Sequence, residues 1–236
     1  MRKILFLPLV IIILQTVASC TKQKSSGYSP TPVNDTLHKT YLALGDSYTI
    51  GESVSEPARF PAQTVSMLLN DSIQFLTPEY IAVTGWTTGN LLNSLNSDAP
   101  ARSTYDFVSL LIGVNNQYQG QSMAQYRTEF TTLLNKAISY AGNRSSRVAV
   151  LSIPDWSVTP FASGRDTALI RSQIDAFNAI NKQITLENGV HYIDITPSTR
   201  MALTDRSLLA ADGLHPSPKE YKKWATMLAA FIRTVL

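Results

Sequence analysis

Three residues have the types and surroundings that nucleophilic catalysis needs. Ser47 lies at the end of an apolar run, and His215 and Asp212 lie in the polar segment DGLHPS. A serine nucleophile requires a base that takes its proton, a carboxylate that orients the base, and N–H donors for the developing oxyanion. Because Gly213 lets the chain turn between them, the Asp212 carboxylate can fold back onto the His215 imidazole. The three residues therefore predict a Ser-His-Asp relay.

Other residues fit these roles less well. His38 lies in or beside a polar N-terminal segment, and His191 lies in a strand pattern, where a core or edge histidine is expected. Asp46 adjoins Ser47, and a place beside the nucleophile suits a residue that braces the loop. The single cysteine excludes a cysteine-rich zinc site and the three histidines leave little for a histidine cluster, so we expect no metal.

The elements that must position these residues alternate between strand and helix patterns. Apolar runs predict buried strands at 41–44, 80–83, 107–112 and 148–153, with a weaker one at 190–195. The clearest helical patterns occupy 122–141, 166–187 and the segment after Ser217, where Pro218 at the first position is typical of a helix start. This alternation implies right-handed crossovers and an α/β fold whose parallel sheet is covered by helices on both faces.

Parallel strands end at one edge of the sheet, and ligands bind at that edge. Ser47 follows the first predicted strand, Gly85 the second and Asn115 the third. If the strand order is 2-1-3-4-5, the first strand lies between the second and third. This order would bring the three residues together.

Four short segments carry a resemblance to a known family. They are GDSYTIGE with Ser47, TG with Gly85, GVNN with Asn115, and DGLHPS with Asp212 and His215. Each stands after a predicted strand or before the last helix, in the order in which the four blocks of the SGNH (GDSL-type) hydrolase superfamily occur. The sequence therefore resembles a member of that superfamily over nearly the whole predicted domain.

This resemblance implies a flavodoxin-like, three-layer α/β/α fold with the sheet order 2-1-3-4-5. It also implies an oxyanion hole made of the backbone N–H groups of Ser47 and Gly85 and the side-chain amide of Asn115, with no metal or organic cofactor. Two positions depart from the family pattern. Tyr48 replaces the leucine of the GDSL motif, and Asn116 stands where the family usually has aspartate.

Aromatic and acidic residues near the strand ends are candidates for substrate binding. Trp86 follows Gly85, and Asp155 and Trp156 follow the fourth predicted strand. A packing role for Trp86 and a solvated loop position for Asp155 are equally compatible with the sequence.

The N-terminus resembles a bacterial lipoprotein leader. Two basic residues precede an apolar run, and the small residues 17–19 stand directly before Cys20, the only cysteine. We therefore expect a signal peptide at residues 1–19, a lipidated Cys20 that begins a polar tether through residue 38, and a hydrolase domain at 39–236. The protein would then be anchored to a membrane outside the cytoplasm.

Composition excludes one further class. The formal net charge is +3, and without the two basic residues of the leader it is +1, too little for the phosphate contacts that nucleic-acid binding requires. We thus expect a monomeric serine esterase that forms an acyl-enzyme on Ser47, with a short-chain, most simply acetyl, ester of a carbohydrate as substrate, by analogy with the superfamily. A lysophospholipase or acyltransferase of the same fold and a non-catalytic surface carbohydrate-binding protein remain alternatives.

Overall fold

The computed structural model describes residues 38–236. The predictions about the signal peptide, Cys20 and the tether up to residue 37 lie outside the described residues. Within 38–236, no helix combines the length and the apolar character that crossing a lipid bilayer requires.

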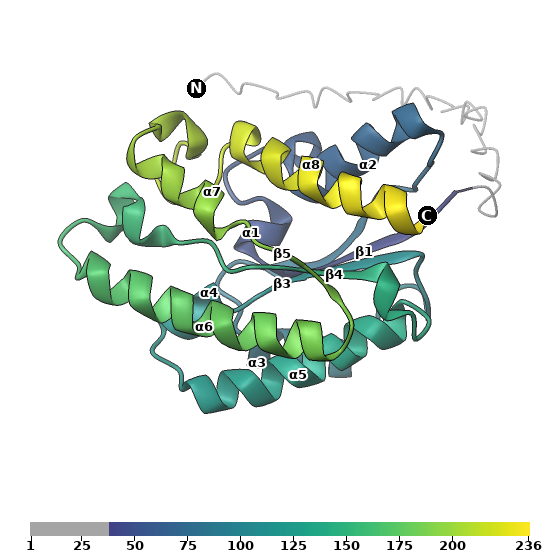
Figure 1. Ribbon diagram of the computed structural model, residues 1–236, viewed down its shortest axis with the longest axis horizontal. Helices are drawn as coiled ribbons and strands as arrows, with labels where there is room; N and C mark the ends of the chain where they lie inside the picture. Colours follow the sequence, from purple (N-terminus) through teal and green to yellow (C-terminus); the bar gives the residue numbers. More distant parts are fainter. Residues whose placement is uncertain (1–37) are drawn as a thin grey trace, which may run out of the picture. The chain divides into compact units, whose positions relative to one another are not determined.

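The centre of the fold is a sheet of five parallel strands in the order β2-β1-β3-β4-β5, as predicted (Figure 1). In the register, Ala43 of β1 is paired with Tyr80 of β2 and with Ser109 of β3. The strands are β1 (Tyr41–Asp46), β2 (Glu79–Val83), β3 (Phe107–Leu111), β4 (Val148–Leu151) and β5 (His191–Ile193). Because β1 lies between β2 and β3, the segments that follow these three strands meet at one edge of the sheet.

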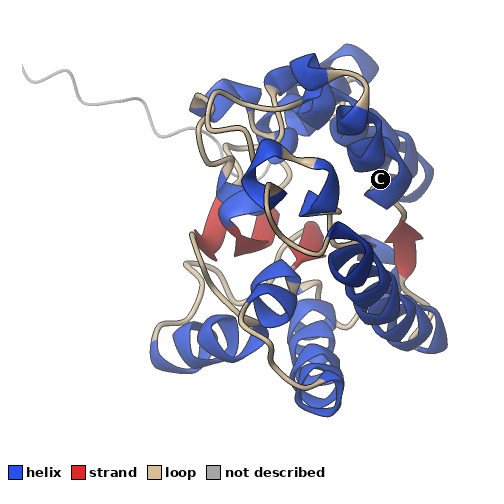
Figure 2. Ribbon diagram, turned by 90° about the vertical axis from the view of Figure 1, so that its left-hand side faces the viewer, coloured by secondary structure: helices blue, strands red, loops and turns tan. Residues whose placement is uncertain are grey.

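Helices cover both faces of the sheet, which gives the predicted three layers (Figure 2). On one face α2 (Phe60–Leu68) packs along α8 (Pro218–Val235), and on the other α5 (Met123–Tyr140) packs between α3 (Thr88–Ser97) and α6 (Thr167–Glu187). The shorter helices are α1 (Ser47–Ile50), α4 (Val114–Tyr118) and α7 (Thr196–Arg200).

The three predicted helices begin within one residue of the predicted positions. The side chains of Ser122, Asp166 and Ser217 each accept a hydrogen bond from the backbone N–H three residues later, at the starts of α5, α6 and α8. Such bonds satisfy N–H groups that have no acceptor within the helix. Two strands are shorter than expected: β5, which carries polar residues, spans three residues, and β4 ends at Leu151, three residues before Pro154.

Close packing at the end of β1 brings the chain into position for the site. All six residues of β1 are buried. A Cβ atom on Gly45 would lie 2.1 Å from Thr49 Oγ1 and 2.4 Å from the Leu111 carbonyl oxygen, so only glycine fits there. The absence of a side chain at Gly45 lets α1 fold back tightly against β1 and places Ser47 at the sheet edge.

Candidate active site

Ser47 is the first residue of α1, directly beyond the carboxyl end of β1. The Asp46 carboxylate accepts a hydrogen bond from the Tyr48 N–H at 3.0 Å and so caps the helix. The helix ends after one turn at Gly51, whose φ of +67° is the left-handed conformation that glycine adopts without strain. Ser47 is only 4% exposed, but its side chain lines a cavity.

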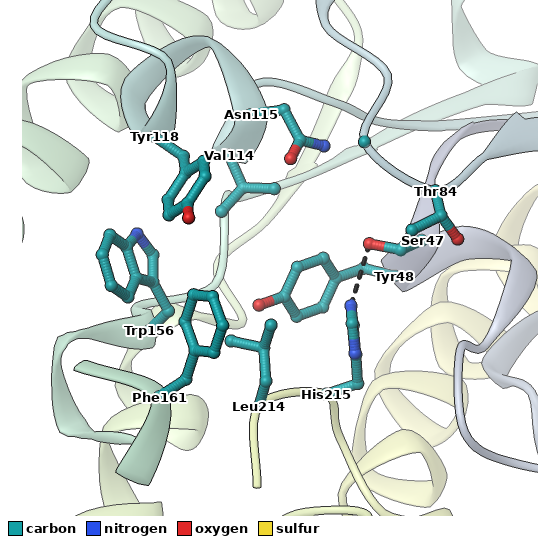
Figure 3. A pocket seen from close by; sticks show the side chains of 11 residues that line it. Ser47, Tyr48, Thr84, Val114, Asn115, Tyr118, Trp156, Phe161, Leu214 and His215 are labelled. Carbon is teal, nitrogen blue, oxygen red and sulfur yellow. Dashed lines mark hydrogen bonds between the residues drawn. The ribbon is translucent and has the colours of Figure 1, made fainter. Parts of the chain in front are cut away.

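The structure brings the three residues of the predicted relay together. His215 Nε2 lies 2.9 Å from Ser47 Oγ (Figure 3). His215 Nδ1 lies 2.6 Å from Asp212 Oδ2. The turn between them is closed by Asp212 Oδ1, which accepts hydrogen bonds from the backbone N–H groups of Leu214 at 2.9 Å and His215 at 3.0 Å. One carboxylate thus shapes the turn with one oxygen and orients the imidazole with the other.

The Asp212 carboxyl is held in its charged form. Partial burial acts to raise its pKa, but the hydrogen bonds from His215, the Leu214 N–H and Ser53 outweigh this effect and lower the pKa to about 2. An ionised Asp212 accepts the Nδ1–H of His215, which leaves Nε2 free to accept a proton from Ser47. The arrangement therefore suits His215 to act as a general base.

Ser53 is a further member of this network that the sequence analysis did not single out. Its hydroxyl donates to Asp212 Oδ2 at 2.7 Å. Ser53 has a φ of +64°, which is uncommon for a residue other than glycine and costs free energy that surrounding contacts must offset. The Asp212 side chain is 29% exposed, so the Ser53 hydroxyl occupies a position on the carboxylate that water could otherwise take. Serine in a polar loop has no distinctive sequence pattern, which is why the contact became visible only in the fold.

The predicted oxyanion donors lie on the other side of Ser47. Asn115 is in α4, and its amide Nδ2 donates to the Trp86 carbonyl oxygen at 2.9 Å. Because a carbonyl oxygen can only accept, this bond settles which end of the amide faces Trp86 and leaves the same nitrogen a second N–H as a donor. Gly85 lines the cavity in a turn with φ +83°, and the Ser47 N–H, at the start of α1, has no acceptor within the helix.

Asn116 points away from the cavity and ties two segments together. It is fully buried; its Oδ1 accepts from the Thr88 N–H at 3.0 Å, and its Nδ2 donates to Thr88 Oγ1 at 2.6 Å and to Gln121 Oε1 at 2.7 Å. The Thr88 hydroxyl in turn donates to Glu129. Asn115 therefore fastens α4 to the segment between β2 and α3, which carries Gly85, and Asn116 fastens it to the start of α3.

The cavity beside Ser47 has a volume of about 150 Å³ and is mostly apolar. Its far wall consists of three aromatic rings in mutual edge or tilted contact, with centroids 5.5 to 6.0 Å apart, which belong to Tyr118, Trp156 and Phe161. The Arg165 guanidinium lies over all three rings, and Trp156 Nε1 donates to Gln117 Oε1 at 2.8 Å. The wall is thus fixed from several directions.

Of the three residues predicted to contact substrate, the structure places only Trp156 in this cavity. Trp86 packs against the hydrophobic core and contributes its backbone carbonyl to Asn115. Asp155 is 1% exposed and forms ion pairs with Arg200 at 2.7 Å and Arg171 at 3.5 Å. Asp155 therefore belongs to the packing around Trp156, because a carboxylate is buried without a large cost only when it is paired.

The competing residues lie elsewhere. His191 is on β5 at the sheet edge, with its ring stacked on Phe231 at 3.9 Å between centroids. His38 precedes β1, at the opposite end of that strand from Ser47. Asp46 is completely buried and bonded to the Tyr48 N–H, and burial raises its pKa to about 7. The imidazole that contacts Ser47 is oriented by Asp212 and not by Asp46.

The sequence matches a known family over most of its length. Residues 43–223 fit the model of the GDSL-like lipase/acylhydrolase family. The chain therefore belongs to this family of ester-hydrolysing enzymes, which confirms the resemblance noted from the four segments. No curated protein sequence matches the chain at a significant level.

Solved structures share the fold. A lipase/acylhydrolase from Enterococcus faecalis is 20% identical, with a TM-score of 0.63 over 83% of this chain and 96% of that one. An acetylxylan esterase from Geobacillus stearothermophilus is 19% identical, with a TM-score of 0.63 over 82% and 94%. A member of the lipolytic G-D-S-L family from Veillonella parvula is 17% identical, with a TM-score of 0.60 over 84% and 99%. At these identities the likeness concerns the fold.

The contact between Ser53 and Asp212 generates a first prediction. Ser53→Ala removes a hydrogen bond to a charged group, and we expect kcat on a simple ester to fall about tenfold with KM little changed. Ser53→Gly also removes the hydroxyl but relieves the positive φ, so it should be as slow as the alanine variant while being more stable. Ser55→Ala, in the same exposed loop, is the control. Equal rates for Ser53→Ala and Ser55→Ala would refute the role of the Ser53 hydroxyl.

The buried Asp46 generates a second prediction, on stability. The pKa of Asp46 is 3.8 in the unfolded chain and about 7 in the folded protein. Between these pH values the folded protein holds the proton and the unfolded chain does not, so the wild type loses stability as the pH rises from 4 to 7. Asp46→Asn keeps an acceptor for the Tyr48 N–H but does not titrate. The free energy of unfolding of Asp46→Asn, relative to that of the wild type, should therefore increase as the pH rises from 4 to 7, by at most about 4 kcal/mol. Above pH 7 the difference should stay constant.

Urea denaturation of both proteins at pH 4.5, 6 and 8 measures this difference. Asp98→Asn controls for the removal of one negative charge at an exposed position. A difference between Asp46→Asn and wild type that stays constant over the three pH values would contradict the assignment.

Proposed function

We propose that this family member is a serine esterase that transfers a short acyl group from an O-acyl ester to Ser47 and then to water. The observation that carries the proposal is the continuous chain of hydrogen bonds from Asp212 through His215 to Ser47, with distances of 2.6 and 2.9 Å. Ser47 and His215 adjoin an apolar cavity and oriented N–H donors. A substrate carbonyl there has both a nucleophile and a site for its negative charge.

The reaction follows from this geometry in two steps. Ser47 Oγ attacks the carbonyl carbon while His215 Nε2 takes its proton, and the oxyanion is held by the N–H groups of Ser47, Gly85 and Asn115. The ester C–O bond then breaks, and His215 returns the proton to the departing alcohol oxygen. In the second step His215 takes a proton from water, the resulting hydroxide attacks the acyl carbon, and the proton passes back to Ser47 Oγ as the carboxylic acid leaves.

The size of the cavity supports a short acyl group. A volume of about 150 Å³ matches that of engineered apolar cavities that hold one benzene molecule. Such a space holds an acetyl group or an acyl chain of a few carbons, whereas a long fatty chain would extend past the aromatic wall into solvent.

A carbohydrate ester is the substrate class we favour, in part because one protein of similar fold is an acetylxylan esterase. We further propose that Cys20 carries lipid and holds the enzyme on a membrane outside the cytoplasm, where acetylated polysaccharides are encountered. The arguments for this location are the basic and apolar leader and the small residues before Cys20.

Labelling with a fluorophosphonate tests the proposed nucleophile. The wild type should bind the probe covalently, and Ser47→Ala should not, because the probe reacts only with an activated hydroxyl. Acetate release from acetylated xylan should disappear in the same variant. Labelling that persists in Ser47→Ala would assign the nucleophile elsewhere, and an unlabelled wild type without esterase activity would refute the proposed function.

Asn115→Ala tests the oxyanion hole. Removal of one donor lowers the rate by roughly 10²–10³-fold, and because the interaction strengthens in the transition state the loss should appear in kcat and not in KM. Gln119→Ala is a suitable control, since Gln119 also donates to this loop, at the Gly85 carbonyl, but from outside the cavity lining. An Asn115→Ala variant that loses less than about fivefold in kcat would contradict the assignment.

Cys20→Ala tests the lipid anchor. Without the thiol, no lipid can be attached, so the protein should move from the membrane fraction to the soluble fraction of cells that express the full chain. Mass spectrometry of the N-terminal peptide identifies the modification directly. A wild-type protein that lacks lipid on Cys20 and is soluble would refute the proposed location.

A further inference from the structure

We propose that Glu52 and Thr84 bind hydroxyl groups of a neutral, polyhydroxylated alcohol, on the leaving-group side of Ser47. This inference deepens the proposed esterase function and rests on it. It concerns the half of the substrate that the aromatic cavity does not hold.

The two sides of Ser47 differ in chemistry. Tyr118, Trp156 and Phe161 lie on one side, and Thr84, which also lines the cavity, lies on the other (Figure 3). A tetrahedral intermediate has four substituents, of which one is Ser47 Oγ and one is the oxyanion at the donors. With the acyl group in the apolar cavity, the alcohol oxygen remains within reach of His215 Nε2, and the rest of the alcohol extends toward Thr84.

Glu52 is held at this side by several contacts. Its backbone N–H donates to the Ser47 carbonyl oxygen at 2.9 Å, and Thr84 Oγ1 donates to Glu52 Oε2 at 2.5 Å. The neighbouring residues Gly51 and Ser53 both have left-handed φ values, and Ser53 is fastened to Asp212. The loop therefore presents the Glu52 carboxylate in one place. Thr84 occupies one carboxylate oxygen, which leaves lone pairs on the other for a ligand.

The negative charge around Glu52, Thr84 and Asp212, here called the rim, favours some alcohols over others. Glu52 and Asp212 flank Ser53 and contribute two carboxylates, and within residues 38–236 Glu52 is bonded to the Thr84 hydroxyl and not to a basic side chain. Arg59 packs beside Gly51 but directs its guanidinium onto the Tyr80 ring at 5.3 Å. Carboxylates repel a phosphate and accept charge-assisted hydrogen bonds from hydroxyl groups. The rim thus favours a sugar over a phosphoglycerol.

The experiment compares three carboxylic esters whose alcohol parts differ. These are 4-nitrophenyl acetate, whose leaving group has no free hydroxyl, a mono-O-acetyl methyl xylopyranoside, and lysophosphatidylcholine. The quantity measured is kcat/KM for the sugar ester divided by kcat/KM for nitrophenyl acetate. Effects on the shared steps at Ser47 cancel in this ratio.

We expect Glu52→Gln to lower the ratio by about tenfold or more, mainly through KM of the sugar ester, because a charge-assisted hydrogen bond becomes a neutral one. Thr84→Val, which releases the carboxylate, should lower the ratio in the same direction by a smaller factor and serves as the second variant if Glu52→Gln fails to fold. Glu56→Gln changes a carboxylate three residues beyond Ser53 and should leave the ratio unchanged.

Different outcomes would overturn the inference and refute the esterase function on which it rests. An equal loss on both acetyl esters in Glu52→Gln would mean that Glu52 only supports the loop with Gly85. A wild type that cleaves nitrophenyl acetate but not the sugar ester, or that prefers lysophosphatidylcholine, would assign the rim to another alcohol. A wild type that cleaves no ester and does not react with a fluorophosphonate would instead refute the esterase function itself.

Discussion

The position of β1 between β2 and β3 is the constraint on which the site depends. Because β1 has a neighbour on each side, the residue that follows it lies between the loops after β2 and β3, and those loops carry Gly85 and Asn115. Gly45 lets α1 pack closely against the end of β1, because any side chain there would collide with Thr49 and with the β3 backbone. The hydrogen bond from Ser47 to His215 then joins the sheet edge to the segment that precedes α8.

Periodicity and helix caps allowed the fold to be predicted in most of its parts. The strand order followed from the alternation of elements together with the resemblance, and the apolar period from residue 122 and the Ser217-Pro218 pair located two helix starts to within one residue. Ser47, Asp212 and His215 could be singled out because each lies in a short segment directly beyond a predicted strand or before the last helix, and Asp212 and His215 are close in sequence. The short helices α1 and α4 gave no periodic pattern, since one turn is too short to show one.

What the sequence left open depends on contacts between distant segments. Asp155 looked like a pocket residue because it follows β4, yet its carboxylate is buried against Arg200, 45 positions along the chain. Ser53 lies 159 positions from the carboxylate that it contacts, and Asn116 acts on Thr88 from a neighbouring element. A single sequence shows which side chains can form such bonds. Only the folded chain decides which partners they meet and which way a loop residue such as Trp86 turns.

The base and its orienting carboxylate lie in one turn, three residues apart, and Asp212 shapes that turn through two backbone N–H groups. Their mutual geometry is therefore formed mainly by contacts within the turn. The relay is completed by two contacts with distant segments, from His215 to Ser47 and from Ser53 to Asp212. A displacement of the one segment that contains this turn would separate His215 from Ser47 and abolish hydrolysis while the sheet and the helices that cover it stay intact.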